Sequence, residues 1–332
     1  MIKPDRFRAY CELFVFYLEG VNVGFLIQTN GVLINEEWIQ VFKDYKVCVG
    51  VSIDGPEAEN DKYRLSNSGE GTYAKTVAGL KKLQQAFEGE YAHLGPSVIS
   101  VINPLFDYKK IFKHIHLDLK VNTLSFLLPD CQHDTGLPIG STAERYGDIL
   151  CDILDAWDET GQKANVRQLD DLFSHFQMRR PEIEVAGEIE DTKSNQIIVV
   201  QSDGSISIDD TYMVALEWRN AQETPNVSGE ELKTYLSRPI ILEIDDLNMT
   251  LPETCQSCCW ANICKGGDLE NRYSRKNGFN NPSVFCGGLK TFYAHTISHL
   301  INNGYPQHNI EDFLFSNTIR KKFFLNAVEL ID

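Results

Sequence analysis

The sequence predicts an α/β protein in which parallel strands are covered by helices and are followed by a small cysteine-rich domain. Short, continuously apolar runs alternate with stretches of helical period, which is typical of parallel strands buried under helices. Polar residues follow the ends of several of these runs, where ligands gather in such folds. The third observation is a group of cysteines in the last third of the chain: Cys255, Cys258, Cys259, Cys264 and Cys286.

The first part of the chain has four expected strands separated by three expected helices. The strands are expected at Val23–Gln28, Lys46–Ile53, Ser97–Ile102 and Leu124–Pro129. The helices are expected at Glu36–Tyr45, Thr72–Phe87 and Asp107–Asp118. Asn35 is placed to cap the first of these helices, and acidic residues in its first turn suit the positive end of the helix dipole.

Two more helices are expected at Ser141–Thr160 and Asn165–Gln177. The acidic, polar segment Glu182–Asn195 is an expected domain boundary. Residues Gln196–Asp209 are expected to form a hairpin, because Asp203-Gly204 supplies a favoured two-residue turn. The tail from Gly287 returns to helical patterns.

Composition excludes some classes of partner. The chain has 332 residues, of which 42% are hydrophobic and 23% charged, and its formal net charge is −16. An acidic surface repels nucleic acids and anionic membranes, so neither is expected as a partner. No apolar run has the length of a membrane span, and the charged N-terminal stretch is unlike a secretory signal. We therefore expect a cytoplasmic protein.

The cysteine group predicts a metal site, because a dense group of thiols in a reducing compartment is more typical of a metal site than of disulfides. Cys255 and Cys258 form a CxxC pair, and Cys264 and Cys286 supply two further thiolates for zinc or a [4Fe–4S] cluster. Spacing alone leaves the metal open, and a set of buried cysteines without metal is the remaining alternative. Cys259 is expected to be a neighbour, although it could substitute as a ligand.

These residues also carry a family resemblance. The stretch Cys255–Cys286 resembles the SPASM/twitch auxiliary-cluster domain of radical SAM peptide maturases. Ile27–Trp38 and Gly50–Tyr73 resemble the radical SAM barrel of anaerobic sulfatase-maturating enzymes. Phe126–Pro138 and Glu144–Glu159 resemble the maturases that crosslink aromatic residues in ribosomally made peptides, the cyclophane formers.

The resemblance implies an incomplete parallel (β/α) radical SAM barrel followed by a small α+β cysteine-rich SPASM/twitch domain. It divides the chain into a partial barrel at 1–135, a helical linker region at 136–195, the auxiliary-cluster domain at 196–290 and C-terminal helices at 291–332. It also implies that S-adenosylmethionine (SAM) is bound at the ends of the strands. The residues implied for this role are Gln28, Asn30, Ser52, Asp54 and Arg64.

One element of the family pattern is absent from the sequence. Radical SAM enzymes hold the cluster that cleaves SAM with three cysteines, usually as CxxxCxxC, and this motif does not occur here. We therefore expect a late start with four of the six barrel strands, as a truncated or mis-called N-terminus would give. Asp268 stands where a fuller SPASM pattern has another cysteine, which favours one auxiliary cluster over two.

The predicted function is that of a radical SAM/SPASM maturase that modifies a ribosomally made precursor peptide. The resemblance implies hydrogen-atom abstraction and crosslink formation as the chemistry, with SAM and a [4Fe–4S] auxiliary cluster as cofactors. No catalytic residue is predicted. Two alternatives stay open: a non-catalytic peptide-binding remnant and a zinc-stabilised structural protein.

Overall fold

The computed structural model describes residues 2–176, 197–220 and 224–315. The chain forms two compact units, of which the first comprises residues 1–128 and 152–171. The second comprises residues 129–151 and 172–332. The expected boundary segment Glu182–Asn195 lies outside the described residues.

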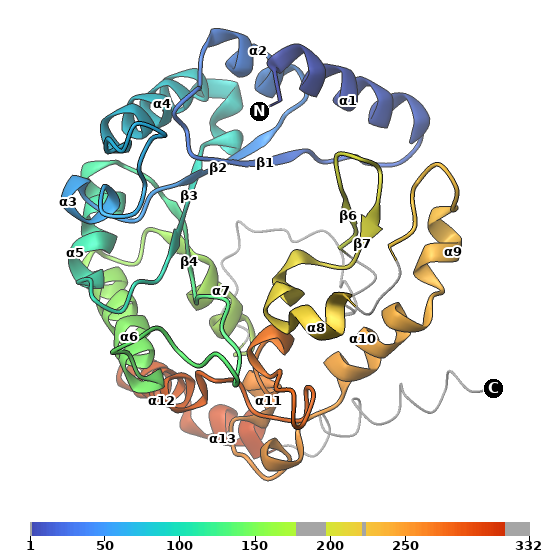
Figure 1. Cartoon of the computed structure of the whole chain (residues 1–332). Coiled ribbons are helices and arrows are strands. Elements are labelled where there is room, and N and C mark those ends of the chain that lie inside the picture. The colour runs from blue at the N-terminus through green and yellow to red at the C-terminus, as the bar shows by residue number, and fades with distance from the viewer. Residues whose placement is uncertain (1, 177–196, 221–223, 316–332) are drawn as a thin grey trace. The chain divides into compact units, whose positions relative to one another are not determined.

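The first unit is built on a sheet of five parallel strands in the order β1-β2-β3-β4-β5 (Figure 1). Gln28 of β1 lies opposite Gly50 of β2, and Val51 of β2 lies opposite Val98 of β3. The strands are β1 (Leu26–Thr29), β2 (Cys48–Ser52), β3 (Ser97–Val101), β4 (Thr123–Leu127) and β5 (Asn165–Val166). Parallel pairing places the C-terminal ends of all five strands at the same edge of the sheet.

Helices cover the outer face of this sheet in Figure 1. They are α1 (Pro4–Tyr17), α2 (Glu36–Asp44), α3 (Glu57–Asn60), α4 (Tyr73–Ala86), α5 (Tyr108–Lys113) with the π-helical turn η2 (His114–Asp118), the second part of α6 (Ala143–Glu159), and the start of α7 (Arg167–Ser174). The short 3-10 turn η1 (Gly89–Leu94) precedes β3. Asn35 caps α2 as expected, since its side-chain oxygen accepts from Trp38 N at 3.0 Å.

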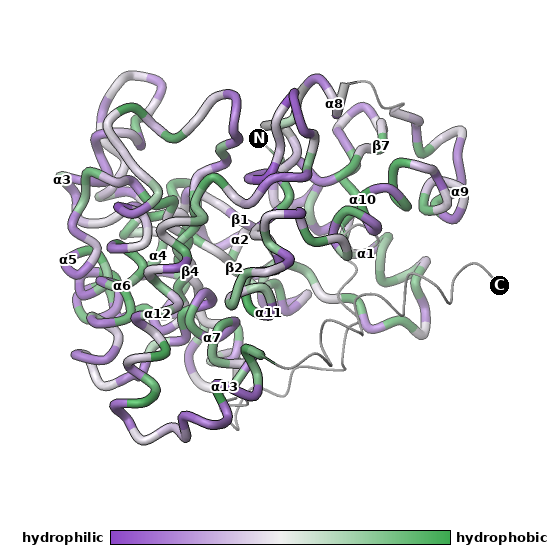
Figure 2. The backbone as a smooth tube through the Cα atoms, turned by 90° about the horizontal axis from the view of Figure 1, so that it is seen from below, coloured by the Kyte–Doolittle hydropathy of each residue, from purple (hydrophilic) through white to green (hydrophobic). Residues whose placement is uncertain are grey.

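The packing of the first unit follows from its apolar pattern. Helix α2 buries Trp38, Ile39, Val41 and Phe42 on one face, and its exposed face is acidic. In β2 three consecutive residues, 49–51, are buried, as expected for a strand covered on both faces. Figure 2 shows apolar and polar residues interspersed along helices α5 and α6, as amphipathic helices require. The predicted α/β class is therefore confirmed.

Two elements of this unit differ from the expectation. The sheet has five strands where four were expected, because β5 occupies Asn165–Val166 at the start of a stretch expected to be helical throughout. A strand of two residues is too short to show a period of two, and Val166 leads directly into α7. Helix α1 was not predicted at all, since its apolar residues are mixed with charges on every side.

The second unit contains a hairpin followed by short helices. The hairpin pairs β6 (Val199–Val200) with β7 (Ile206–Ser207) in antiparallel fashion, and Gly204 in its turn has a φ of 83°. The turns and helices that follow are η4 (Asp210–Ala215), α8 (Leu216–Asn220), α9 (Leu232–Leu236), α10 (Pro239–Met249), η5 (Glu253–Cys255), α11 (Ala261–Cys264), η6 (Leu269–Asn271), α12 (Cys286–Asn302) and α13 (Gln307–Phe315). The predicted hairpin is present. Helices α12 and α13 lie in the tail expected to be helical, of which residues 316–332 lie outside the described residues.

An apolar core joins the hairpin to the cysteine-rich segment. Ile206 of β7, Tyr235 of α9 and Ile241 of α10 pack in one cluster with Leu269 and Phe279. Because Leu269 and Phe279 belong to the segment between Cys264 and Cys286, this core fixes the loop that carries the cysteines.

The two glycines Gly147 and Gly288 bring the first part of α6 against α12. A Cβ on Gly147 would lie less than 3.0 Å from the backbone of Gly288, and a Cβ on Gly288 would collide with the carbonyl of Ala143. Only glycine permits this approach of the two backbones.

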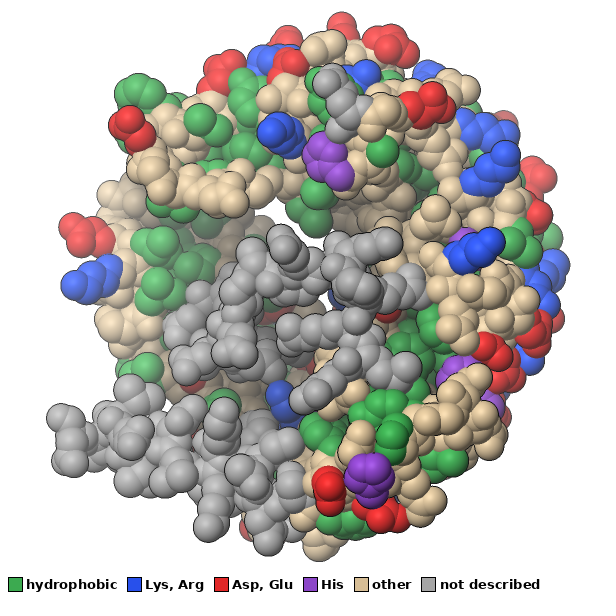
Figure 3. Space-filling model, turned by 180° about the vertical axis from the view of Figure 1, so that it is seen from behind, with side chains coloured by type: hydrophobic (Ala, Val, Ile, Leu, Met, Phe, Trp, Pro, Cys, Tyr) green, Lys and Arg blue, Asp and Glu red, His purple; other side chains and the backbone are tan. Residues whose placement is uncertain are grey.

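On the face shown in Figure 3, acidic and basic side chains are interspersed. None of the helices in the described parts of the chain is long and apolar enough to cross a membrane.

Candidate metal centre

The four cysteines expected as ligands are presented by two short helical elements, the turn between them and the start of the longer helix α12. Cys255 ends the 3-10 turn η5, Cys258 lies in the turn that follows, and Cys264 ends α11. Cys286 is the first residue of α12. The segment Cys255–Cys264 is closed by consecutive turns, such as Cys258 N–H to Cys255 C=O at 3.1 Å.

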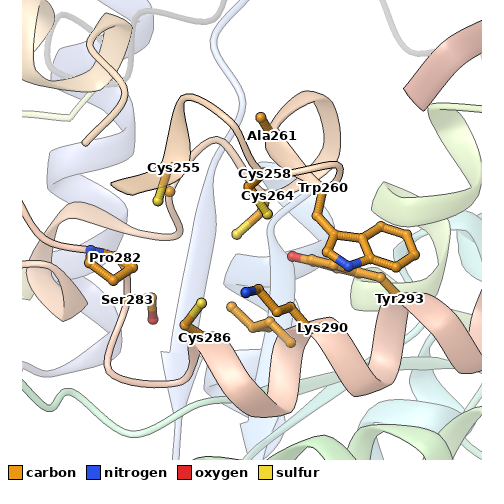
Figure 4. A pocket seen from close by; sticks show the side chains of 12 residues that line it. Cys255, Cys258, Trp260, Ala261, Cys264, Pro282, Ser283, Cys286, Lys290 and Tyr293 are labelled. Carbon is orange, nitrogen blue, oxygen red and sulfur yellow. The ribbon is translucent and has the colours of Figure 1, made fainter. Parts of the chain in front are cut away.

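These four cysteines line one pocket (Figure 4). In this view their sulfurs point into a shared space, and the side chains of Trp260, Lys290 and Tyr293 lie at its rim. Among the described residues, no three His, Cys, Asp or Glu side chains are grouped so closely that they could hold a single metal ion.

Glycines permit the backbone to close around the pocket. Gly266 and Gly267 have φ values of 89° and 82°, in the left-handed region that favours glycine. A Cβ on Gly267 would lie about 2.5 Å from Cβ of Ser283. The C=O of Gly266 accepts from Ser283 N–H at 2.9 Å, so this turn anchors the loop that leads to Cys286.

The pocket is an apolar environment for thiols. Burial raises the pKa of Cys264 to about 11, and burial is also the main cause that raises the pKa of Cys255. The Tyr293 hydroxyl forms a hydrogen bond with the Cys264 side chain, which opposes part of the rise at Cys264. Thiols in such surroundings are inert unless a metal takes the place of the proton.

A buried cation lies beside the pocket. Arg272 is 2% exposed and donates hydrogen bonds to the carbonyl oxygens of Phe279, Leu247 and Thr250 at 3.0–3.3 Å. Desolvation lowers the pKa of this guanidinium, and the charges of Cys255 and Cys264 act in the opposite direction.

Sequence reasoning missed Arg272, Lys290 and Tyr293. Lys290 and Tyr293 follow Cys286 at i+4 and i+7 on α12, and this spacing puts all three on the same face of a helix. That spacing is a usable sequence signal. Arg272 has no comparable local signal, because its position depends on how the loop folds back.

The remaining cysteines lie elsewhere. Cys259 is exposed and is not among the residues that line the pocket. Cys11 is in α1, Cys48 in β2, Cys131 in the loop after β4 and Cys151 in α6. No three of these cysteines are grouped as ligands in the described part of the chain.

The residues expected to bind SAM lie at or after the C-terminal ends of β1 and β2. Gln28 Nε2 donates to Ser52 Oγ at 2.9 Å, so these two polar side chains of neighbouring strands are joined. Asn30 lies in the turn after β1, where its Oδ1 accepts from Val32 N–H at 3.2 Å. Its carbonyl also accepts from Thr76 Oγ1 of α4 at 2.9 Å.

Asp54 and Arg64 form a second pair. The Arg64 guanidinium donates to both carboxylate oxygens of Asp54, with N–O distances of 2.6 and 3.0 Å. The side chains are 16% and 27% exposed, so the pair is partly shielded from water. The Asp54 N–H donates to Asn60 Oδ1 at 3.2 Å, which ties the pair to α3.

Two amide side chains connect the cysteine-rich segment to its surroundings. Asn262 of α11 donates to the carbonyl oxygens of Phe313 and Leu314, at the end of α13, at 2.8 and 3.2 Å. Asn271 of η6 donates to the carbonyl of Cys131 at 3.0 Å.

The fold class follows from a solved structure of similar fold. The solved structure of native anSMEcpe with bound AdoMet and Cp18Cys peptide superposes with a TM-score of 0.74 at 22% identity, over 90% of this chain and 81% of that chain. The chain therefore has the α/β fold of the radical SAM enzymes. No protein-family model matches the sequence.

Sequence comparison then indicates the relatives. The chain is 25% identical over 313 residues to a cysteine-type anaerobic sulfatase-maturating enzyme of Clostridium novyi, covering 90% of this chain and 78% of the relative. It is 23% identical over 318 residues to the serine-type enzyme of Bacteroides thetaiotaomicron, covering 90% and 74%. The chain is thus homologous to the anaerobic sulfatase-maturating enzymes, and this homology supports an enzyme.

Proposed function

We propose that this chain is a radical SAM maturase that acts on a polypeptide and carries a [4Fe–4S] auxiliary cluster held by Cys255, Cys258, Cys264 and Cys286. The observation that carries the proposal is that these four thiols line one pocket in a chain homologous to maturating enzymes. Four thiolates are the ligand set of a [4Fe–4S] cluster, and such a cluster supplies one-electron chemistry.

A zinc-stabilised protein is the alternative for the same cysteines. Tetrahedral zinc binds each sulfur at about 2.3 Å, which brings the sulfurs to within about 3.8 Å of one another. Four cysteines at one pocket suit either centre, and the homology to maturating enzymes favours the cluster.

Anaerobic purification with iron, sulfide and zinc analysis tests the centre. We expect iron and acid-labile sulfide in the wild-type chain, and loss of both in Cys264→Ala. Cys259→Ala is the matched control, because Cys259 is a neighbour that does not line the pocket. Stoichiometric zinc without sulfide would instead support the structural alternative.

We further propose that Gln28, Asn30, Ser52, Asp54 and Arg64 bind SAM at the ends of β1 and β2. Support comes from their placement at one edge of the sheet and from the bound AdoMet in the solved structure of similar fold. Gln28 and Ser52 offer a donor and acceptor pair, and Arg64 offers a cation for a carboxylate. Because Arg64 is already paired with Asp54, SAM would have to share this cation or displace Asp54 from it.

Equilibrium dialysis with radiolabelled SAM tests this site. We expect Gln28→Leu to weaken binding, since Leu cannot donate to Ser52 or to a ligand. Gln40→Leu is the control, because Gln40 hydrogen-bonds Asp44 on the exposed side of α2. Equal affinity of both variants would remove Gln28 from the site.

The cluster that cleaves SAM does not fit the cysteines of these 332 residues. No CxxxCxxC occurs, and the four cysteines at the pocket are assigned to their own centre. We therefore propose that the chain alone does not cleave SAM reductively. The test is an anaerobic assay of iron-reconstituted protein with SAM and dithionite, and multiple turnovers of 5′-deoxyadenosine would overturn the proposal.

Two polypeptide substrates are candidates. The resemblance of Phe126–Pro138 and Glu144–Glu159 to crosslinking maturases supports a ribosomally made precursor peptide. The names of the homologues support a sulfatase as the second candidate. Pull-down with the chain as bait, using a synthetic peptide from a sulfatase and one from a ribosomal precursor, would show which one is retained.

A further inference from the structure

The Arg272 guanidinium is a buried charge that no carboxylate compensates. Its three hydrogen-bond partners are backbone carbonyls, and in the described part of the chain it forms no ion pair with Asp or Glu. A buried charge is unfavourable unless an opposite charge offsets the lost hydration. Neutral carbonyl dipoles provide only part of that compensation.

Two thiols of the pocket, which become thiolates when they hold a cluster, are among the groups that act electrostatically on this cation. Arg272 interacts electrostatically with Cys255 and Cys264. Its Cδ lies 3.7 Å from the position of a Cβ on Gly266, a residue that lines the pocket. The Arg272 side chain therefore passes close to Gly266 of the pocket wall, while Arg272 itself does not line the pocket.

Tyr293 approaches the same sulfurs from α12. Its hydroxyl is hydrogen-bonded to the side chain of Cys264, and its ring packs against Trp260 with centroids 5.7 Å apart. A metal-bound Cys264 has no proton to donate, so in the assembled centre the Tyr293 hydroxyl is the donor and the sulfur is the acceptor.

We propose that Arg272 and Tyr293 are tuning residues of the four-cysteine centre: Arg272 is its buried counter-ion, Tyr293 donates a hydrogen bond to it, and both raise its reduction potential. This inference rests on the proposed iron–sulfur centre. It assigns that centre a raised reduction potential, which the cysteines alone do not determine.

The physical reason is the charge added on reduction. A cluster with four thiolates is anionic, and one further electron adds one more negative charge in a medium of low dielectric constant. A fixed cation and a hydrogen bond to sulfur stabilise the more negative state most. Arg272 and Tyr293 should therefore make reduction of the centre more favourable, as suits a centre that accepts an electron.

The experiment is a potentiometric titration of the full chain, reduced with dithionite in the presence of mediators and followed by electron paramagnetic resonance. Arg272→Met and Tyr293→Phe should both shift the midpoint to lower potential. Arg272→Lys keeps the charge and should stay nearer to the wild type than Arg272→Met. Arg275→Met is the matched control, because Arg275 is a nearby arginine that is exposed and paired with Glu217.

The outcomes separate two claims: that Arg272 and Tyr293 tune the centre, and that the centre is an iron–sulfur cluster. Unchanged midpoints in Arg272→Met and Tyr293→Phe, with wild-type iron and sulfide content, would overturn the tuning while leaving the proposed cluster intact. A wild-type chain with zinc and no sulfide would overturn both. If circular dichroism shows that Arg272→Met does not fold, Tyr293→Phe decides: a lowered midpoint supports the proposal and an unchanged one rejects it.

Discussion

Among the cysteines at the pocket, Cys264 has the thiol whose pKa is raised most. Because burial raises its pKa to about 11, the metal-free protein at pH 8 should hold about a hundredfold less Cys264 thiolate than a thiol with a pKa of 9. Since only the thiolate reacts, we expect slow alkylation of Cys264 by iodoacetamide, with a rate that still rises above pH 10. Mass spectrometry of tryptic peptides measures this rate.

The exposed Cys259 serves as the internal reference for that alkylation, because it lies five residues away on the same peptide segment. Equal rates at the two cysteines at pH 8 would show that the pocket is open to water in the metal-free protein. Metal loading should protect Cys264 and leave Cys259 reactive.

The Asp54–Arg64 pair should contribute to stability as a unit. Because the pair has two hydrogen bonds and is partly buried, its contribution to the free energy of unfolding should lie between those of surface and buried ion pairs. Arg64→Met should therefore destabilise the fold by about 1–2 kcal/mol. Asp54→Asn should cost a similar amount, and the double variant should cost less than the sum. Chemical denaturation of the four proteins measures this coupling, and strict additivity would contradict it.

At the scale of residues, the sequence predicted the grouping of the cysteines but not their electrostatic surroundings. CxxC spacing and nearby glycines are local features, so a common placement of Cys255 and Cys258 at one pocket could be anticipated. Arg272 lies near the pocket because its loop folds back beside Gly266. Contacts of that kind depend on tertiary folding, which one sequence does not reveal.

At the scale of elements, the contact between α6 and α12 depends on glycine. A Cβ at Gly288 would collide with the backbone of α6, so Gly288→Ala should cost about 1–3 kcal/mol through overpacking. Because Gly288 lies two residues after Cys286, the same change should lower the iron content of the purified protein. Thermal unfolding and iron analysis measure the two effects.

Gly229→Ala is the control for that substitution, since a Cβ there would meet no atom closer than 3.9 Å. Its melting temperature and iron content should equal those of the wild type. A Gly288→Ala variant as stable as this control would mean that the helices can separate without cost.

The elements that could be predicted are those with a local signature. Asn35 caps α2 through its own side chain, and the turn at Gly204 joins the hairpin, so both are encoded within a few residues. Strand β5 has two residues, and its pairing with β4 exists only in the assembled sheet. Helix α1 buries Cys11 alone, which leaves no apolar periodicity to detect.

At the scale of the whole molecule, the edge of the main sheet should govern solubility. Among the described strands, β1 pairs only with β2, and Leu26 on this edge strand is 76% exposed. Phe16 and Tyr17 at the end of α1 are 74% and 75% exposed. Exposed strand edges and apolar side chains promote association between molecules.

Leu26→Lys should therefore reduce aggregation, because a charged residue on an edge strand opposes pairing with another chain. Static light scattering over a concentration series measures the effect. Leu105→Lys is the control, since Leu105 is 73% exposed in the loop after β3. Equal scattering by the two variants would show that overall charge, and not the strand edge, controls association.

The hydrogen bonds from Asn262 to the end of α13 have a consequence for protein motion. Local opening of α13 must break both bonds, and the residue that donates them lies two positions before Cys264. A metal that holds Cys264 in place should therefore slow amide hydrogen exchange across Gln307–Phe315, although no atom of that helix lines the pocket. Hydrogen exchange in α13 would then report the loading state of the centre, and Asn262→Ala would remove this link.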